Sequence, residues 1–70
     1  MLDPLHLALD ALRDELAPLA ICHLDAASQQ APAGNFAALT ATATARDFAE
    51  RGDFDDAAHF VEQAIAALDA

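Results

Sequence analysis

Three histidines and one cysteine are the residues of this 70-residue chain best suited to catalysis or metal binding. His6 and Asp10 are one helical turn apart, as are Asp55 and His59, so each pair could share a local hydrogen bond or begin a metal site. Zinc needs three or four converging ligands, and neither pair has a further histidine or cysteine nearby in the sequence. We therefore expect no metal and no cofactor, and interpret the histidines as exposed or capping residues.

Cys22 is the single cysteine, so no disulfide can form within the chain. Cys22 and His23 are adjacent and point in different directions on a helix, and no turn or helix N-terminus activates the thiol. Among Ala20 and Ile21, such a cysteine is expected to be a small buried apolar side chain. An intermolecular disulfide, a reactive thiol, or a nucleophile paired with a distant histidine remain alternatives.

Other catalytic or ligand-binding motifs are also missing from the sequence. Two glycines are too few for a phosphate-binding loop. The acidic run over residues 52–63 superficially suggests a calcium loop, but Ala57 and Ala58 stand where an oxygen ligand and the turn glycine are needed. A chain of this size also offers little concave volume for a substrate. We predict that the protein is not an enzyme.

The charge balance restricts the partners of the chain. The chain has twelve acidic residues, three arginines and no lysine, which gives a net charge of −9. Such a field repels nucleic-acid phosphates and anionic membranes and attracts basic protein surfaces. We expect a protein partner with a basic surface and no direct binding of nucleic acid or membrane. With no signal-peptide pattern and no apolar run of spanning length, a cytoplasmic location is expected.

The second half of the chain predicts a helical hairpin, with helices over about 36–51 and 54–69. Asn35 suits the N-cap of the first helix, and Asp53 that of the second. Gly52 stands where the first helix must end in a left-handed residue. The second helix has apolar residues at three- and four-residue steps: Phe54, Ala57, Val61, Ala64, Ile65 and Leu68.

The first half predicts one long amphipathic helix over about 4–28. Asp3 and Pro4 form a start signal. The face expected to be buried carries five leucines: Leu5, Leu9, Leu12, Leu16 and Leu19. Pro18 either bends this helix or ends it. Because no good cap precedes Pro18, we predict a bend, followed by a loop over Ser28–Asn35 that contains Pro32. The prediction is therefore an all-α, single-domain protein, residues 1–70: a three-helix bundle whose Pro18-kinked first helix packs on the hairpin.

The segment Thr40–Ala70 resembles one tetratricopeptide repeat, a helix–turn–helix unit of about 34 residues. The resemblance rests on aromatic, turn and small positions, namely Phe48, Gly52, Phe54, Ala57 and Ala64. Ala41 replaces the early tryptophan-like residue of that motif, and Thr44-Ala45 replaces its Leu-Gly pair. The resemblance covers about half the chain and implies a helical hairpin that binds protein.

Six acidic residues gather in sequence around the hairpin turn: Asp47, Glu50, Asp53, Asp55, Asp56 and Glu62. They either form a solvated surface or a docking face for an Arg/Lys-rich protein. With Phe60, which lies off the main apolar stripe, they are our predicted partner-binding residues. The resulting hypothesis is a non-catalytic protein-binding module. The alternative is an inhibitor that imitates nucleic-acid charge, as small acidic phage proteins directed against restriction or CRISPR systems do.

The leucines of the first helix exceed what a two-helix hairpin can cover, and Leu2 and Leu7 look left over. A contiguous apolar patch would mark an interface. We expect a homodimer in which the first helices pack together through Leu2, Leu5, Leu7 and Leu9. A binding site for a foreign partner is the rival interpretation of the same residues.

Overall fold

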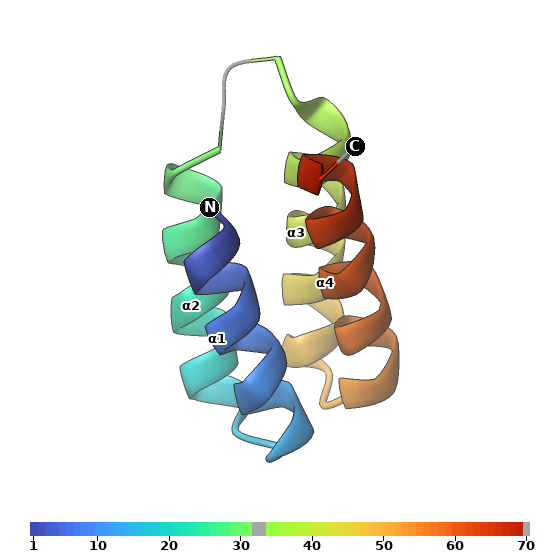
Figure 1. Cartoon of the computed structure of the whole chain (residues 1–70). Coiled ribbons are helices and arrows are strands. Elements are labelled where there is room, and N and C mark those ends of the chain that lie inside the picture. The colour runs from blue at the N-terminus through green and yellow to red at the C-terminus, as the bar shows by residue number, and fades with distance from the viewer. Residues whose placement is uncertain (32–33, 70) are drawn as a thin grey trace.

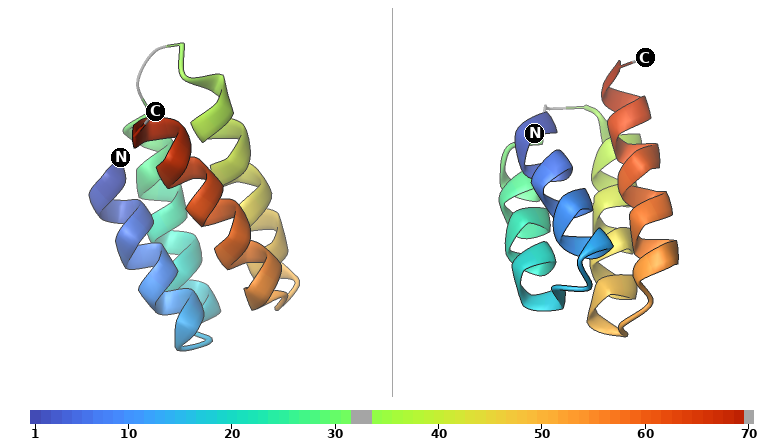
Figure 2. Two further views of the ribbon diagram at one scale, coloured as in Figure 1. Left: turned by 45° about the vertical axis from the view of Figure 1, so that its right-hand side comes forward. Right: turned by 60° about the horizontal axis from the view of Figure 1, so that its bottom comes forward.

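The computed structural model describes residues 1–31 and 34–69, which form an antiparallel four-helix bundle (Figure 1). Each helix packs against the next, and the last returns beside the first, as two further views show (Figure 2). The all-α class is confirmed, whereas the predicted count of three helices is wrong. Pro32 and Ala70, placed in the loop and at the end of the hairpin, lie outside the described residues. The helices are α1 (Leu2–Arg13), α2 (Ala17–Gln29), α3 (Phe36–Glu50) and α4 (Phe54–Asp69).

The predicted long helix over about 4–28 is two helices, because the chain turns back at residues 14–16. Glu15 adopts a left-handed conformation with φ 58°. Its N–H donates to the Leu12 carbonyl at 3.1 Å, and the Leu16 N–H donates to the Ala11 carbonyl at 2.9 Å. These two bonds form the Schellman motif that ends helices. The motif normally has glycine at the left-handed position, so Glu15 gave no stop signal in the sequence.

Pro18 lies in the first turn of α2 and not in the middle of a kinked helix. A proline there loses nothing, since the N–H that it lacks has no partner inside the helix. A helix continuing through Pro18 would instead clash with the carbonyl of Asp14. Ending the helix before Pro18 therefore removes the clash with the Asp14 carbonyl, whereas a bend would only have reduced it.

The break also changes which side chains of α2 face inward. Leu16 and Leu19, expected on the buried stripe, are 47% and 46% exposed. Cys22, expected to be buried, is exposed as well. Ala20 and Leu24 face the core. The turn at 14–16 resets the rotation of the helix, so the leucine period of α1 does not continue into α2.

The turn between α3 and α4 uses the same Schellman motif with the expected glycine. Gly52 has φ 77°. The Gly52 N–H donates to the Ala49 carbonyl at 3.1 Å, and the Asp53 N–H donates to the Phe48 carbonyl at 2.9 Å. At the other end of α3, the Asn35 side chain caps the helix by accepting from the Ala38 N–H at 3.2 Å. At the start of α1, Asp3 lies within the first turn, and Met1 occupies the N-cap position without a side-chain bond.

The core consists mainly of alanine. Among the residues that the structure describes, ten of the fifteen buried hydrophobic residues other than proline are alanines. The largest fully buried side chains include Leu5, Leu12, Leu24 and Val61. Thr42, also buried, donates its hydroxyl to the Ala38 carbonyl at 2.8 Å. Small side chains let helix axes approach closely. No helix in the described part of the chain is both long and apolar enough to cross a membrane.

The two Schellman turns predict stability changes of opposite sign. Glu15→Gly removes the cost of holding a residue with a Cβ atom in the left-handed backbone conformation, so it should raise the free energy of unfolding by about 1 kcal/mol. Gly52→Ala introduces the same cost and should lower the free energy of unfolding by about 1 kcal/mol. Urea unfolding followed by circular dichroism measures both. Glu15→Gln is the control, because it removes the charge and keeps the Cβ atom. If Glu15→Gln stabilised as much as Glu15→Gly, charge and not backbone strain would explain the gain.

Candidate interaction site

The predicted acidic residues divide into three groups in the structure. Asp53, Asp55 and Asp56 lie together at the α3–α4 turn, and all three are exposed. Asp55 and Asp56 occupy the first turn of α4, where the helix dipole favours negative charge. Glu62 is also exposed, but it lies about 9 Å further along α4 than Asp56. The remaining two, Asp47 and Glu50, are on α3.

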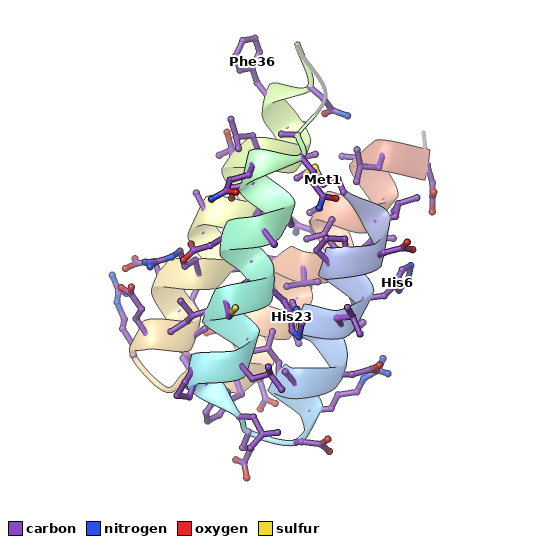
Figure 3. The ribbon with its side chains drawn as sticks, turned by 90° about the vertical axis from the view of Figure 1, so that its left-hand side faces the viewer. Met1, His6, His23 and Phe36 are labelled. Atoms are coloured by element: carbon purple, nitrogen blue, oxygen red, sulfur yellow. The ribbon has the colours of Figure 1, made fainter. Side chains whose placement is uncertain are left out.

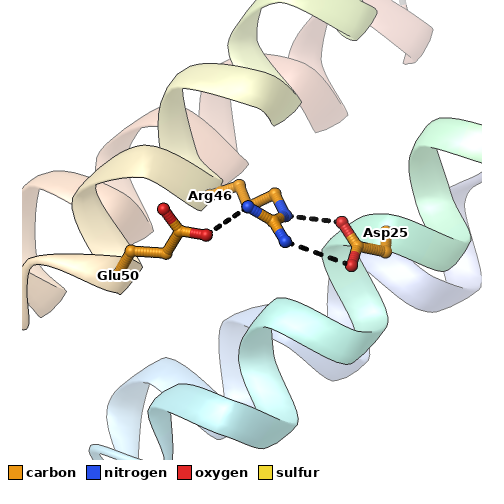
Figure 4. Close-up of polar contacts among 3 residues, drawn as sticks. All are labelled: Asp25, Arg46 and Glu50. Carbon is orange, nitrogen blue, oxygen red and sulfur yellow. Dashed lines mark hydrogen bonds and ion pairs between the residues drawn. The ribbon is translucent and has the colours of Figure 1, made fainter.

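Asp47 and Glu50 are partly neutralised by arginines. Arg51 pairs with Asp47, with Nη2 and Oδ2 2.7 Å apart. Arg46 lies between Glu50, which it contacts through Nη1, and Asp25 of α2, whose Oδ1 is 2.6 Å from Nε (Figure 4). The Asp25 contact links the two halves of the bundle. The hydrogen bond to Asp25 is also the main cause that raises the pKa of Arg46.

Asp53, Asp55 and Asp56 differ from Asp47 and Glu50 in that no arginine pairs with them in the described residues. The third arginine, Arg13, is 3.7 Å from Asp10 on α1. Within residues 1–31 and 34–69, none of the ion pairs involves the three acids at the turn. The negative charge of these three side chains is therefore not neutralised by an ion pair, although Arg51 lies two residues before Asp53.

The close spacing of these carboxylates raises the pKa of Asp56. Asp53 raises the pKa of Asp56, first through a hydrogen bond between the two carboxyl groups and then through its negative charge. Loss of hydration and the charge of Asp55 act in the same direction, while His59 opposes them. The folded chain therefore binds this proton more tightly than the unfolded chain. The resulting stabilisation is complete below the carboxyl range near pH 4 and is lost as the pH rises through the pKa of Asp56.

The α1–α2 turn adds two acids that we did not predict. Asp14 and Glu15 are exposed, and their turn lies at the same end of the bundle as the α3–α4 turn (Figure 1). Recognising that Pro18 forces a break would have placed them there, since alternate turns of an up–down bundle share one end. We call the set Asp14, Glu15, Asp53, Asp55 and Asp56 the acidic end.

Phe60 has a structural contact that the sequence did not reveal. Its ring stacks on that of Phe48 across the α3–α4 interface, with centroids 5.5 Å apart and an interplanar angle of 8°. His59 meets Phe60 edge-on at 5.5 Å, and the Arg51 guanidinium lies 5.5 Å from the Phe48 centroid. Phe60 is half-buried, so part of its surface already stabilises the hairpin.

The four leucines of the expected dimer interface separate into two pairs. Leu5 and Leu9 are 0% and 7% exposed and belong to the core of one chain, so they are not available to a second copy. Leu2 and Leu7 are 36% and 51% exposed. Leu2 lines an open hollow of about 340 Å³ with Met1, Asp3, Gln30 and Leu68.

The histidines come from three different helices and do not converge. In Figure 3, His6 points outward from α1, whereas His23 lies on the side of α2 nearest α1. His59, on α4, is 2.9 Å from the Gln63 amide. Among the described residues, no three His, Cys, Asp or Glu side chains are placed to hold a metal ion. The open hollow contains neither a histidine nor a cysteine.

No protein-family model, curated protein or solved structure matches this chain.

The interaction of Asp53 with Asp56 can be measured directly. Asp53→Asn should lower the pKa of Asp56, because it removes the charge that opposes ionisation. A carboxyl-carbon NMR titration of both proteins gives the value. Asp10→Asn, on a different helix, is the control and should leave the Asp56 pKa unchanged. An unchanged Asp56 pKa in Asp53→Asn would show that hydration, not Asp53, controls this group.

The aromatic stack predicts a loss of stability when Phe60 is truncated. Phe60→Ala should lower the free energy of unfolding by about 2 kcal/mol, since it removes a half-buried ring and the stacking of that ring on Phe48. Phe36→Ala provides the matched control, because Phe36 is 74% exposed and its loss should change stability by less than about 0.5 kcal/mol. Chemical denaturation measures both. Equal effects of the two substitutions would contradict a structural role for the stack.

Proposed function

We propose that the chain is a non-catalytic protein-binding module whose acidic end binds a basic surface of another protein. The observation that carries this proposal is the position of Asp53, Asp55 and Asp56, which are exposed together without a neighbouring arginine to pair with them. Clustered charge of one sign steers a partner of the opposite sign and increases the rate of encounter. The resemblance of Thr40–Ala70 to a tetratricopeptide hairpin agrees with protein binding.

An apolar contact supports recognition at this end of the bundle. Leu16, in the α1–α2 turn, is 47% exposed and follows Glu15 directly. Charge alone gives attraction with little selectivity, whereas a leucine beside carboxylates also requires an apolar group on the partner. The partner that fits is a surface or helix on which lysines and arginines surround an apolar side chain.

A second candidate function is inhibition by imitation of nucleic-acid charge, as in phage proteins that block restriction or CRISPR systems. The observation that favours it is that acids from two separate turns share one end of a chain with net charge −9. Such an inhibitor would occupy the basic cleft of a nucleic-acid-binding protein. Competition separates the two functions: DNA or RNA should displace a mimic from its target, and should not displace a module bound elsewhere on its partner.

Neutralising the turn tests the proposal. The triple variant Asp53→Asn, Asp55→Asn and Asp56→Asn keeps side-chain size and the capping ability of residue 53, but removes three charges. Affinity for a partner captured from the source cell should fall at least about tenfold, and the wild-type affinity should fall steeply with salt.

The matched control is Asp3→Asn, Asp10→Asn and Asp69→Asn, which changes the net charge equally and spares the acidic end. This control should retain most of the affinity. Full binding by the first triple variant, or equal losses in both, would show that the acidic end does not determine recognition.

A further inference from the structure

Arg51 is an exposed arginine whose guanidinium lies against an aromatic ring and a carboxylate of its own helix. It is the C-cap residue of α3, and its side chain is 63% exposed. Its Cζ lies 5.5 Å from the centroid of the Phe48 ring, and its Nη2 lies 2.7 Å from Oδ2 of Asp47. A ring face attracts a flat cation and a carboxylate accepts its N–H groups, so the two together suit a guanidinium. The last turn of α3 therefore contains a small guanidinium site, and Arg51 of the same chain occupies it.

The other two arginines of the chain are bound differently. Arg46 contacts carboxylates on both sides, one of them on α2, so it joins α2 to α3. Arg13 is also 63% exposed and lies 3.7 Å from Asp10 of its own helix, but within the described ranges no aromatic ring lies against its guanidinium. Arg51 is thus distinguished by the ring, and not by its exposure or by its ion pair.

The Phe48 ring is held in place by the neighbouring helix and adjoins the acidic end. It stacks on Phe60 of α4, so its position does not depend on Arg51. The Phe48 carbonyl accepts the N–H of Asp53 at 2.9 Å, which joins this turn directly to the first acid of the acidic end. Phe60 in turn lies one helical turn from Asp56. A basic partner bound to the acidic end would therefore also reach the guanidinium site.

The contacts that hold Arg51 in this site are easily exchanged. Its ion pair joins two exposed side chains, and such pairs contribute little to stability. A contact between a cation and a ring is also weak at an exposed position. A guanidinium from another molecule can therefore replace that of Arg51 without disturbing the fold.

We propose that Asp47 and Phe48 form a subsite for an arginine side chain of the basic partner, and that Arg51 moves into solvent when this side chain binds. The inference rests on the proposed function, because the acidic end is what attracts the basic partner to this turn. Arginine is favoured over lysine, since a planar guanidinium stacks on a ring while it bonds a carboxylate, whereas an ammonium is a strongly hydrated point charge. In the free chain Arg51 acts as an internal competitor for the partner's arginine.

Two capped peptides of equal length test the subsite: an arginine–glycine repeat and the matching lysine–glycine repeat. Calorimetric titration of the whole chain gives both dissociation constants. Arg51→Gln removes the internal competitor and should strengthen binding of the arginine peptide about threefold more than binding of the lysine peptide. Arg13→Gln removes the same charge from an equally exposed side chain and should affect the two peptides equally.

Removal of either part of the subsite should abolish the arginine preference that Arg51→Gln produces. Phe48→Leu, added to Arg51→Gln, keeps an apolar side chain in the α3–α4 interface and removes the ring. Asp47→Asn, added to the same variant, changes an exposed side chain and leaves the core untouched. Circular dichroism should show unchanged helix content in both.

Side-chain NMR of the unmodified chain detects the displacement itself. The chain has three arginines, so three Nε–Hε signals are expected. The arginine peptide should move the Arg51 signal towards its position in the single variant Phe48→Leu, where no ring lies beside the guanidinium. The lysine peptide should move it less.

The subsite and the proposed function can fail separately in these measurements. Equal gains for both peptides in Arg51→Gln, an Arg51 signal that stays in place on binding, or a chain that binds neither peptide would overturn the subsite. If both peptides bound equally well and both were lost in the triple variant Asp53→Asn, Asp55→Asn and Asp56→Asn, the acidic end would bind basic groups without the subsite. An arginine preference that this triple variant left intact, at unchanged affinity, would support the subsite and contradict the proposed role of the acidic end.

Discussion

The inability of a helix to continue through Pro18 is the constraint on which the rest of this structure depends. In this chain a turn at residues 14–16 relieves the clash with the carbonyl of Asp14, and Glu15 is the left-handed residue of that turn. Two helices of ordinary length then replace one long helix. Because α2 now runs antiparallel to α1, the bundle closes with four helices, and both tight turns meet at one end. The composition of the acidic end and the exposure of Leu16 and Leu19 follow from this break.

The positions of the three arginines, rather than the number of acidic residues, determine where the surface of this chain is most negative. Arg46 joins α2 to α3 through Asp25, and Arg51 lies over Phe48 while it pairs with Asp47. Exposed ion pairs of this kind each contribute little to stability. Their larger effect is on the field of the molecule, since they reduce the charge beside α3 and leave the start of α4 strongly negative.

The parts of the fold that local signals determine were predictable from the sequence. Asn35 caps α3 and Gly52 ends it, and both have the backbone chemistry that these positions require. The break at Glu15 was not predictable in this way, because a glutamate at a left-handed position is an exception to the glycine rule. The missed break also explains why Leu16 and Leu19 are exposed, since their burial was predicted from an uninterrupted helical period. The burial of Cys22 was predicted from its apolar neighbours Ala20 and Ile21, and that prediction is wrong as well. In the candidate site, the acids of the α3–α4 turn were found from their spacing. Asp14 and Glu15 depend on tertiary arrangement, and so does the contact between Phe60 and Phe48.

The alanines of the core also determine how this protein can change. Where two helices touch through methyl groups, an added methyl has no free volume to enter, and it must push the helix axes apart. Such overpacking typically costs about 1–3 kcal/mol, which is a large part of the stability of so small a domain. Replacements on the solvent side meet no such barrier. We therefore expect the interior of this bundle to resist enlargement by a single carbon atom, while its charges can be rearranged with little effect on the fold.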